Sequence, residues 1–252
     1  MPPSRTRSTR LTPAAGAAPA RSTATTTTAR KGARTRQQIL EAAVDLASAE
    51  GLEGLTIGRL SRDLRMSKAG LFAHFGSKVQ LQLAAIDVAK GIFIREIVEP
   101  ASKAPRGVAR LSAMLEHWLS YVERSVFRGG CFFFAASAEF DDRPGEVHDL
   151  VASLTRAWLE ALEEEVHEGQ RLSEIAHDVD AGQLAFEVHA LVQEANWAFR
   201  LLRMKQSFTL ARRGISRRLE QSVTAAGRKS LVASPRSKRV AATGPSTKRS
   251  RA

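Results

Sequence analysis

Residues Thr56–Lys78 read TIGRLSRDLRMSKAGLFAHFGSK, and this stretch decides the fold of the chain. Thr56 is a candidate helix N-cap because apolar residues follow it at helical spacing. After a break at Arg65–Met66, Ser67 is a second candidate N-cap for another short helix. Two helices of about two turns, joined by about three residues, form a helix-turn-helix, whose second helix lies in the major groove of DNA.

A third helix is predicted to begin at Ser77, because Ser77 and Gln80 have the spacing of a capping box. That start places Lys78 where backbone amides and an ammonium group together suit a phosphate. Capped pairs of short helices also occur in all-α proteins that bind no DNA. The spacing alone therefore leaves DNA binding as one of two interpretations.

The residue types in this stretch favour DNA binding. Residues from about Arg34 to Leu83 resemble the N-terminal domain of the TetR family of bacterial transcriptional regulators. SKAGLFAHFGSK, from Ser67 to Lys78, follows the recognition-helix pattern of that family almost position by position. The resemblance implies an all-α protein with an N-terminal three-helix helix-turn-helix domain and a helical ligand-binding and dimerisation domain.

Four segments are predicted along the chain. They are a disordered basic arm (1–33), the DNA-binding domain (34–80), a helical regulatory and dimerisation domain (81–223) and a disordered basic tail (224–252). Both ends are called disordered because they hold too few apolar groups to offset the entropy of ordering. They are strongly basic: residues 1–36 hold eight Lys and Arg, residues 224–252 hold eight more, and neither contains an acid.

The basic N-terminus has more than one interpretation. It could bind DNA phosphates, be merely solvated, or be an organellar transit peptide. Its prolines and the bacterial resemblance argue against the transit peptide. If it binds phosphates, removing it should weaken binding to all DNA and flatten the salt dependence.

The overall composition narrows the protein class. The chain has 252 residues, 43% of them hydrophobic, which suffices for one or two small domains. Its single cysteine, Cys131, cannot form an internal disulfide, which fits a reducing cytoplasm. No apolar run of 18 or more residues exists, so we expect no membrane partner. Together with the single cysteine, the family resemblance implies a bacterial cytoplasmic location.

The rest of the chain reads as helices, with no β pattern of useful length. Helices are expected from Thr35 to Gly51, from Ser77 to Pro100, over the nearly all-apolar CFFFAASAEF (131–140), from Asp180 to about Met204, and from Phe208 to Val223. The helix from Asp180 has two apolar faces, so one can pack on the core and the other on a partner. A central helix of a monomer is the alternative. The family resemblance implies a homodimer that binds double-stranded DNA at a palindromic operator, with half-sites about one helical turn or somewhat more apart.

Catalytic and metal chemistry are not indicated. Six possible metal ligands lack ligand spacing: His117, Cys131, Glu139, His148, His177 and His189. The sequence has no phosphate-cradling glycine loop and no Gly-x-Ser-x-Gly elbow, so an enzyme, the rival class, has no catalytic constellation. We expect no cofactor. The acidic run 163–165 reads as a solvated helix face.

The family resemblance implies DNA contacts at Thr56, Ser67, Lys68, Ala69, Gly70, Phe72, His74 and Lys78. Lys68 would contact a guanine edge or a phosphate. Phe72 stands where the family usually has a tyrosine that donates to a phosphate, and phenylalanine can only pack against the sugar-phosphate surface. Arg65 replaces a glycine common at the turn, at a cost of about 1 kcal/mol if φ is positive there. Because Gly58 and Gly70 have no side chain to read bases, phosphate contacts and groove fit are expected to dominate.

The family resemblance also implies a small-molecule effector. The predicted pocket residues are Trp118, Phe133, Trp158, His189, Gln193 and Trp197. His189 and Gln193 would be polar anchors in an apolar pocket, so the effector should be hydrophobic, and its binding should release a repressor from its operator. The alternative is a filled core without a pocket, in which these residues simply pack.

Overall fold

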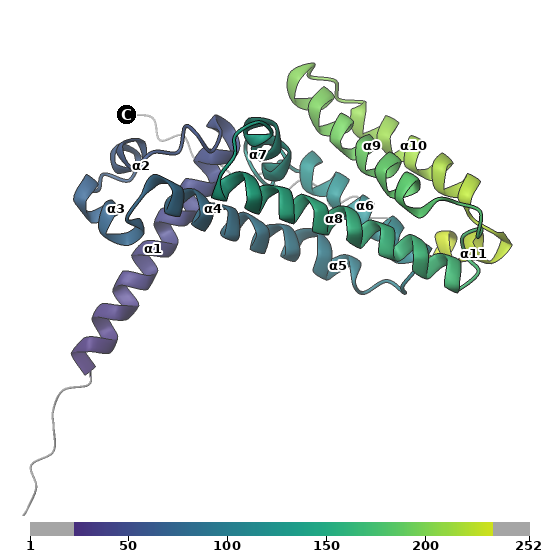
Figure 1. The fold of residues 1–252 in the computed structure, drawn as a ribbon, viewed down its shortest axis with the longest axis horizontal. Coiled ribbons are helices and arrows are strands. Elements are labelled where there is room, and N and C mark those ends of the chain that lie inside the picture. Colours follow the sequence, from purple (N-terminus) through teal and green to yellow (C-terminus); the bar gives the residue numbers. More distant parts are fainter. Residues whose placement is uncertain (1–22, 234–252) are drawn as a thin grey trace, which may run out of the picture. The chain divides into compact units, whose positions relative to one another are not determined.

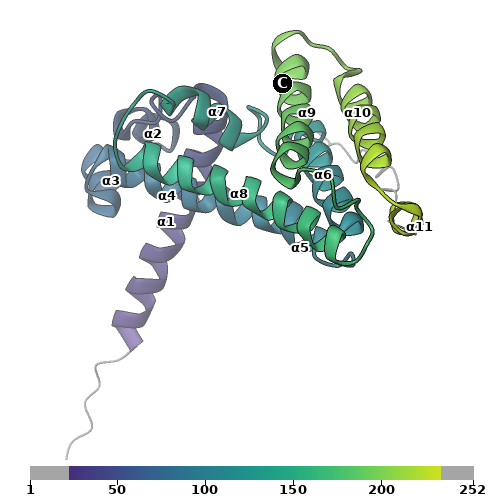
Figure 2. The ribbon, with the colours of Figure 1, turned by 45° about the vertical axis from the view of Figure 1, so that its right-hand side comes forward.

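The computed structural model describes residues 23–233, and over that range the chain is helical, with a single antiparallel bridge between Ile175 and Val223 (Figures 1 and 2). The chain divides into two compact units after Gln37, and the elements discussed below belong to the second unit, apart from the first part of α1. The order is α1 (Thr23–Glu50), α2 (Ile57–Asp63), α3 (Lys68–Phe75), α4 (Lys78–Phe93), η1 (Ile94–Val98), α5 (Glu99–Ala101), α6 (Val108–Glu123), α7 (Phe132–Phe140), α8 (Glu146–Arg171), α9 (Ala181–Leu201), α10 (Ser207–Ser222) and α11 (Ala225–Ala233).

The first helix starts earlier than its predicted start near Thr35. α1 begins at Thr23, so Thr35 lies inside a helix, and residues 23–33 of the expected arm are helical. No proline lies between Pro19 and Pro100, and the alanines and arginines before Thr35 are good helix formers, so nothing local stops the helix. The remainder of the predicted arm, 1–22, lies outside the described residues.

The prediction of a disordered C-terminal tail is wrong at its beginning, where α11 forms. The Thr224 hydroxyl accepts a hydrogen bond from Gly227 N at 3.3 Å, and Thr224 N donates to the Glu174 carbonyl at 2.9 Å. Leu231 packs against the core. This local cap and these distant contacts outweigh the basic composition on which the prediction rested. Residues 234–252 lie outside the described part of the chain.

α4 gives the chain its long connection from the helix-turn-helix to the rest of the second unit. It continues through η1, a π-helical turn, and α5 to Ala101, which confirms the long helix predicted between Ser77 and Pro100. α4 packs along α8, and the two lie side by side in both views (Figures 1 and 2). α8 therefore packs against the helix that leads out of the helix-turn-helix.

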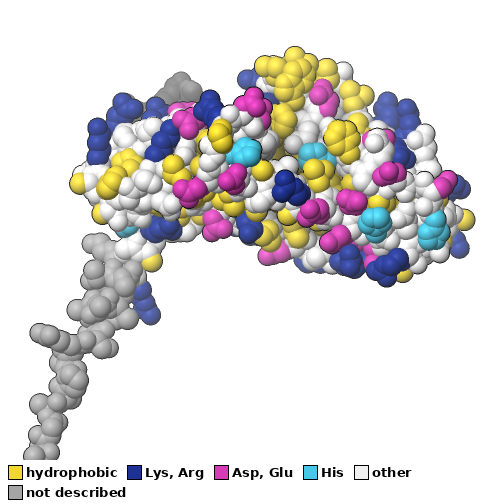
Figure 3. Space-filling model, in the orientation of Figure 1, with side chains coloured by type: hydrophobic (Ala, Val, Ile, Leu, Met, Phe, Trp, Pro, Cys, Tyr) yellow, Lys and Arg dark blue, Asp and Glu magenta, His cyan; other side chains and the backbone are white. Residues whose placement is uncertain are grey.

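α9 has the two faces that the sequence predicts. Its buried face includes Leu184, Val188 and Val192, whereas Phe186 and Leu201 are 63% and 64% exposed. α9 pairs with α10, and hydrophobic side chains gather on the surface near the end of α9, where the chain turns towards α10 (Figure 3). The predicted buried helix is also confirmed: α7 buries Phe132, Ala136 and Phe140.

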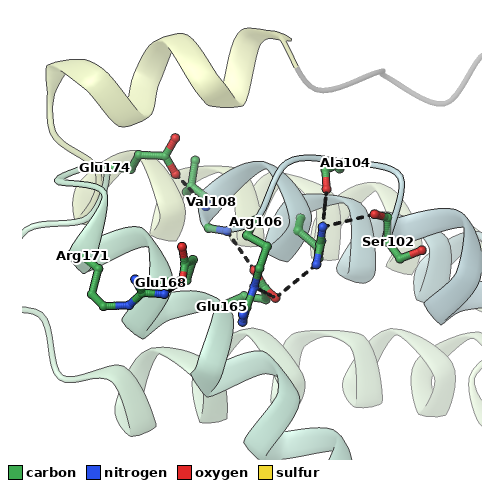
Figure 4. Close-up of polar contacts among 10 residues, drawn as sticks. Ser102, Ala104, Arg106, Val108, Glu165, Glu168, Arg171 and Glu174 are labelled. Carbon is green, nitrogen blue, oxygen red and sulfur yellow. Dashed lines mark hydrogen bonds and ion pairs between the residues drawn. The ribbon is translucent and has the colours of Figure 1, made fainter.

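The acidic run 163–165 is not a solvated face at Glu165, which is only 5% exposed. Its carboxylate accepts hydrogen bonds from Gly107 N at 2.8 Å and from Arg106 Nε at 3.0 Å (Figure 4). Glu174 accepts from Val108 N at 3.0 Å. The two carboxylates cap the start of α6, where Gly107 has no side chain with which to do so. The prediction failed at Glu165 because the cap comes from a helix distant in sequence.

Candidate nucleic-acid interface and ligand hollow

The three predicted helix caps of the helix-turn-helix region are present. The Thr56 hydroxyl accepts from Arg59 N at 3.1 Å, the Ser67 hydroxyl from Gly70 N at 3.0 Å, and the Ser77 hydroxyl from Gln80 N at 3.1 Å. Each cap fixes where a helix begins and leaves its other first-turn amides available. The caps therefore fix the residues at which α2, α3 and α4 begin.

The turn between α2 and α3 needs a left-handed residue, and Arg65 supplies it with φ of +53°. Met66 N closes the turn by donating to the Ser61 carbonyl at 3.0 Å. An L-residue with a side chain is strained in this region, as expected if the turn required positive φ. The arginine side chain is exposed, so no buried contact explains its presence.

α3 turns one face inward and the other to solvent. Leu71 and Phe75 are buried, whereas Lys68, Ala69 and Phe72 are exposed, Phe72 to 56%. Of the other residues predicted to contact DNA, Thr56 and Ser67 are exposed, and Gly70, His74 and Lys78 are half-buried. The exposed face of α3 can therefore enter a DNA groove without any change in the fold.

An open hollow of about 550 Å³ lies on this surface and is lined by Ile57, Gly58, Lys68, Ala69, Phe72 and Ala73. It joins the first turn of α2 to the outer face of α3. Over these two helices, hydrophobic surface lies beside Lys and Arg side chains (Figure 3). Within the described part of the chain, Lys68 makes no hydrogen bond or ion pair, so its ammonium is available to a ligand.

Lys78, in contrast, is already paired. Its Nζ lies 2.8 Å from Glu53 Oε2, in the loop before α2. The donated hydrogen bond holds the pKa of the Glu53 carboxyl below its ordinary value. A phosphate at Lys78 would therefore compete with this carboxylate.

The loop that carries Glu53 is fastened to α7. Glu139 accepts hydrogen bonds from Leu52 N at 2.6 Å and Glu53 N at 2.9 Å. The Leu52 carbonyl in turn accepts from the buried Gln82 amide on α4 at 2.7 Å. Nearby, Gly129 N donates to the Ser48 hydroxyl of α1 at 3.2 Å. The segment that ends in α7 thus holds the start of the helix-turn-helix at several points.

The predicted pocket aromatics form a ring cluster around Phe93, which the sequence analysis did not select. Phe93 packs edge-to-face on Trp158 at 4.9 Å and on Phe133 at 5.7 Å between ring centroids. Trp118 lies 5.5 Å from Trp158 and 5.1 Å from His189. Four of the six predicted residues therefore come together, but as packed rings, as the filled-core alternative describes.

The other predicted residues line a hollow beside this cluster. It measures about 430 Å³ and is lined by Phe134, His189, Ala190, Gln193, Glu194 and Trp197. The hollow opens to solvent beside the exposed face of α9, where Trp197 is 39% exposed. His189 therefore contacts both the ring cluster and the hollow.

Apart from the acidic Glu194, the polar groups here are uncharged, and some of them lack a hydrogen-bond partner. Burial lowers the pKa of His189 to about 4, so its imidazole is neutral at pH 7. Among the described residues, buried Trp158 Nε1 and Gln193 Oε1 have no hydrogen-bond partner. Burial raises the pKa of the Cys131 thiol beside Trp118, so Cys131 is not an ionised nucleophile. The hollow suits an apolar molecule with a few uncharged polar atoms.

Several residues of these sites were missed by sequence reasoning. Ala73 could have been found, because it lies one helical turn after Ala69 on the face already selected. Phe93 and Phe134 could have been found only as further aromatics. Glu53 and Glu139 carry no local signal, because their partners lie far away in sequence.

Metal and membrane features can be judged over residues 23–233. In that range no three His, Cys, Asp or Glu side chains gather in a metal-binding arrangement. No helix among the described residues is long and apolar enough to cross a membrane.

Comparisons with known proteins agree with this architecture. Residues 39–85 match the model of the bacterial regulatory proteins of the tetR family, and residues 107–215 match that of the tetracyclin repressor-like C-terminal domain. A search of curated proteins finds no match. A TetR transcriptional regulator from Chloroflexus aurantiacus is 28% identical, with a TM-score of 0.72 over 77% of this chain and 98% of its own.

Two further solved structures share the fold at lower identity. AibR, in complex with isovaleryl coenzyme A and operator DNA, is 22% identical, with a TM-score of 0.58 over 72% of this chain and 96% of its own. A transcriptional regulator from Saccharomonospora viridis, in complex with choline, is 20% identical, with a TM-score of 0.62 over 76% of this chain and 98% of its own.

Proposed function

Because the chain belongs to the TetR family of bacterial DNA-binding transcriptional regulators, we propose that it is a homodimeric repressor released from its operator by a small hydrophobic effector. It acts in the bacterial cytoplasm, bound to a palindromic site on double-stranded DNA. The observation that carries the proposal is the helix-turn-helix itself, in which α3 presents Lys68, Ala69 and Phe72 to solvent. α3 would read the major groove, and Thr56, Ser67, Gly70, His74 and Lys78 would contact the surrounding backbone.

The dimer follows from the exposed stripe of α9. Phe186, Trp197 and Leu201 recur at helical spacing on the face away from the core, and Leu210 of α10 is 48% exposed. Such an apolar face is costly in water but suits a two-fold contact with a second copy. Two helices from each subunit would give a four-helix interface, and two copies of α3 would read two half-sites.

The effector would occupy the hollow lined by His189, Gln193 and Trp197. Phe134, Ala190 and Trp197 make half of this lining apolar, and its histidine is neutral, which favours a hydrophobic molecule. Glu194, whose side chain is exposed, is the acidic residue of the lining. Gln193 Oε1 would accept a hydrogen bond from the molecule. The AibR and S. viridis structures hold isovaleryl coenzyme A and choline, two unlike molecules, so neither identifies the effector of this chain.

α7 supplies the physical link between effector and operator. Phe134 lines the hollow, and Glu139, further along the same helix, holds the amides of Leu52 and Glu53. At the start of the segment, Cys131 N donates to the Asn196 side chain of α9 at 3.2 Å. A molecule that displaces Phe134 would therefore shift α7 and pull on the loop that precedes α2.

The expected size of the effect is modest. An effector shifts an equilibrium only by its differential affinity for the two arrangements, typically about 1–3 kcal/mol, or 5- to 150-fold in operator affinity. A shift of that size requires two packings of α7, not continuous bending.

Two measurements test the proposal. Selection from random duplexes with the purified protein, followed by footprinting on the selected sequence, should yield a protected palindrome. A thermal-shift screen of hydrophobic compounds should then yield stabilising molecules that also weaken operator binding. Failure to select any sequence would overturn the DNA-binding part. Stabilising compounds that leave operator affinity unchanged would overturn the release mechanism.

A further inference from the structure

The hollow between α2 and α3 differs in chemistry from a surface made only to bind a polyanion. Of its six lining residues, only Lys68 has a side-chain donor, and the others are Ile57, Gly58, Ala69, Phe72 and Ala73. Phe72, more than half exposed, stands at its wall on the solvent face of α3. Small side chains at Ala69 and Ala73 leave that ring uncovered.

The edges of base pairs in the major groove offer hydrogen-bond donors, hydrogen-bond acceptors and one apolar group, the C5-methyl of thymine. Side chains of alanine and phenylalanine can read only the methyl. The alternative target is the sugar of the DNA backbone, which carries no sequence information. Phe72, Ala69 and Ala73 lie on the outward face of the helix predicted to enter the groove, with Ala69 in its first turn and Phe72 near its middle. Residues in the N-terminal part of such a helix stand nearest the base edges, which favours the base edges as the target.

We propose that this hollow is a receptor for the C5-methyl group of pyrimidines in the operator and that Phe72 is its specificity-determining residue. The inference rests on the proposed function, since it requires that α3 enters the major groove. Gly58 keeps the floor of the hollow open: a Cβ built there would stand 3.8 Å from Lys68 Cε and meet no other heavy atom within 4 Å. Lys68, on the rim, binds an adjacent guanine edge or phosphate.

Two sources carry the same methyl, thymine and 5-methylcytosine. Replacing thymine by deoxyuridine removes only the methyl, and replacing cytosine by 5-methylcytosine adds only the methyl. The first pair tests thymine reading at unchanged base pairing. For the second pair, the T·A base pair at each sensitive position is first exchanged for C·G. Comparing cytosine with 5-methylcytosine there tests whether the methyl group alone is sufficient for tighter binding.

The experiment uses the full chain and the duplex selected from random sequence. With the wild-type protein, deoxyuridine at one or two positions of each half-site should weaken binding roughly three- to fivefold, the effect of one buried methyl group. At those positions 5-methylcytosine should bind more tightly than cytosine by a similar factor. Phe72→Ala should abolish both differences. Val79→Ala, at an exposed apolar residue of α4 that does not line the hollow, should retain them.

Each outcome decides the question. If no duplex is selected, the proposed DNA-binding function fails first. If a duplex is selected but deoxyuridine is tolerated at every position, the hollow faces the backbone and the inference is overturned. If the deoxyuridine penalty persists in Phe72→Ala, another residue reads the methyl, which also overturns it. Gly58→Leu, which fills the hollow from α2, should remove the penalty as Phe72→Ala does.

Discussion

Glu139 Oε2 lies 2.6 Å from the backbone nitrogen of Leu52, and its other carboxylate oxygen lies 2.9 Å from that of Glu53. One side chain of α7 thus satisfies two amides of the loop that leads into α2. The fit is close, because a Cβ added at Gly51 would stand 2.7 Å from the same carboxylate. Glu139 therefore both stabilises this loop and ties it to the helix that lines the proposed effector hollow.

Glu139→Ala should destabilise the protein by about 2 kcal/mol, because it leaves the Leu52 and Glu53 amides without a charged acceptor. Glu139→Gln, which keeps one acceptor oxygen, should lose about half as much. Urea unfolding followed by circular dichroism measures both values. Ser137→Ala on the same helix removes only a bond to the Phe134 carbonyl and should change stability by less than about 0.5 kcal/mol.

The same variants test whether effector binding is coupled to operator affinity through Glu139. With any effector found in the thermal-shift screen, Glu139→Ala should bind the compound but show a smaller loss of operator affinity than the wild type. If Glu139→Ala responds as fully as the wild type, α7 does not transmit the signal through this carboxylate.

Glu53 forms an ion pair with the Lys78 ammonium, which a DNA phosphate would otherwise bind. Glu53→Gln should therefore tighten DNA binding, by about threefold at low salt. Freeing one phosphate contact should also steepen the slope of log K against log salt by roughly 0.9. Asp87→Asn is the matched control, since Asp87 is exposed on α4 and its loss changes the net charge equally. Equal effects of the two substitutions would show that net charge, not the Lys78 pair, governs affinity.

Local signals in the sequence predicted what local chemistry decides. Thr56, Ser67, Ser77 and Asp180 each cap the helix that they were predicted to start, because a cap depends on only a few neighbouring residues. Contacts between distant residues were not predictable. Glu139 and Leu52 lie 87 positions apart, and neither residue type indicates the other.

The errors of sequence reasoning have the same origin. The buried carboxylate of Glu165 and the α11 helix both depend on partners supplied by distant segments of the chain. Both predictions rested on the composition of a single segment, and contacts with distant residues decided the structure in both places. Four of the six predicted pocket residues, Trp118, Phe133, Trp158 and His189, lie in one ring cluster. Whether such rings pack together or enclose a hollow depends on side-chain packing, which hydrophobic periodicity does not describe.

The dimer can be tested on the exposed stripe of α9. Phe186→Glu and Leu201→Glu place a charge in the proposed interface, and each should convert the protein to a monomer at micromolar concentration, as measured by light scattering. Leu172→Glu replaces a leucine that is 49% exposed just after α8, and it should leave the dimer intact. A wild-type protein that is already monomeric at this concentration would contradict the interface directly.

Arg65 offers a test of backbone strain at the turn. Arg65→Gly and Arg65→Ala remove the same exposed guanidinium, but only glycine adopts φ of +53° without strain. The glycine variant should be more stable than the alanine variant by about 1 kcal/mol in urea unfolding. Equal stabilities would mean that the turn relaxes to negative φ when the side chain is lost.

The last prediction concerns pH and the His189 imidazole. Burial lowers its pKa to about 4 in the folded protein, against about 6.5 in the unfolded chain, so the folded state favours the neutral ring. The resulting stability is fully present above about pH 6.5 and is lost progressively as the pH falls towards 4, because the unfolded state then binds the extra proton. For a half-buried ring we expect the loss to be on the order of 1–2 kcal/mol. Urea unfolding of the wild type, His189→Phe and His189→Gln at pH 7.0, 6.0, 5.0 and 4.5 measures it.

Both variants lack the titrating ring, so their stability should fall less steeply than that of the wild type between pH 6.5 and 4.5. The pKa values of Glu53 and Glu187 are also lowered, in each case by a hydrogen-bonded partner, Lys78 for Glu53 and Gln183 with Arg218 for Glu187. Stability from these carboxylates is lost as the pH falls through their folded pKa values, below the window used here, and equally in all three proteins. Parallel curves for the three proteins would show that His189 is not held neutral by burial, and the neutral imidazole assigned to the proposed effector hollow would fail with it.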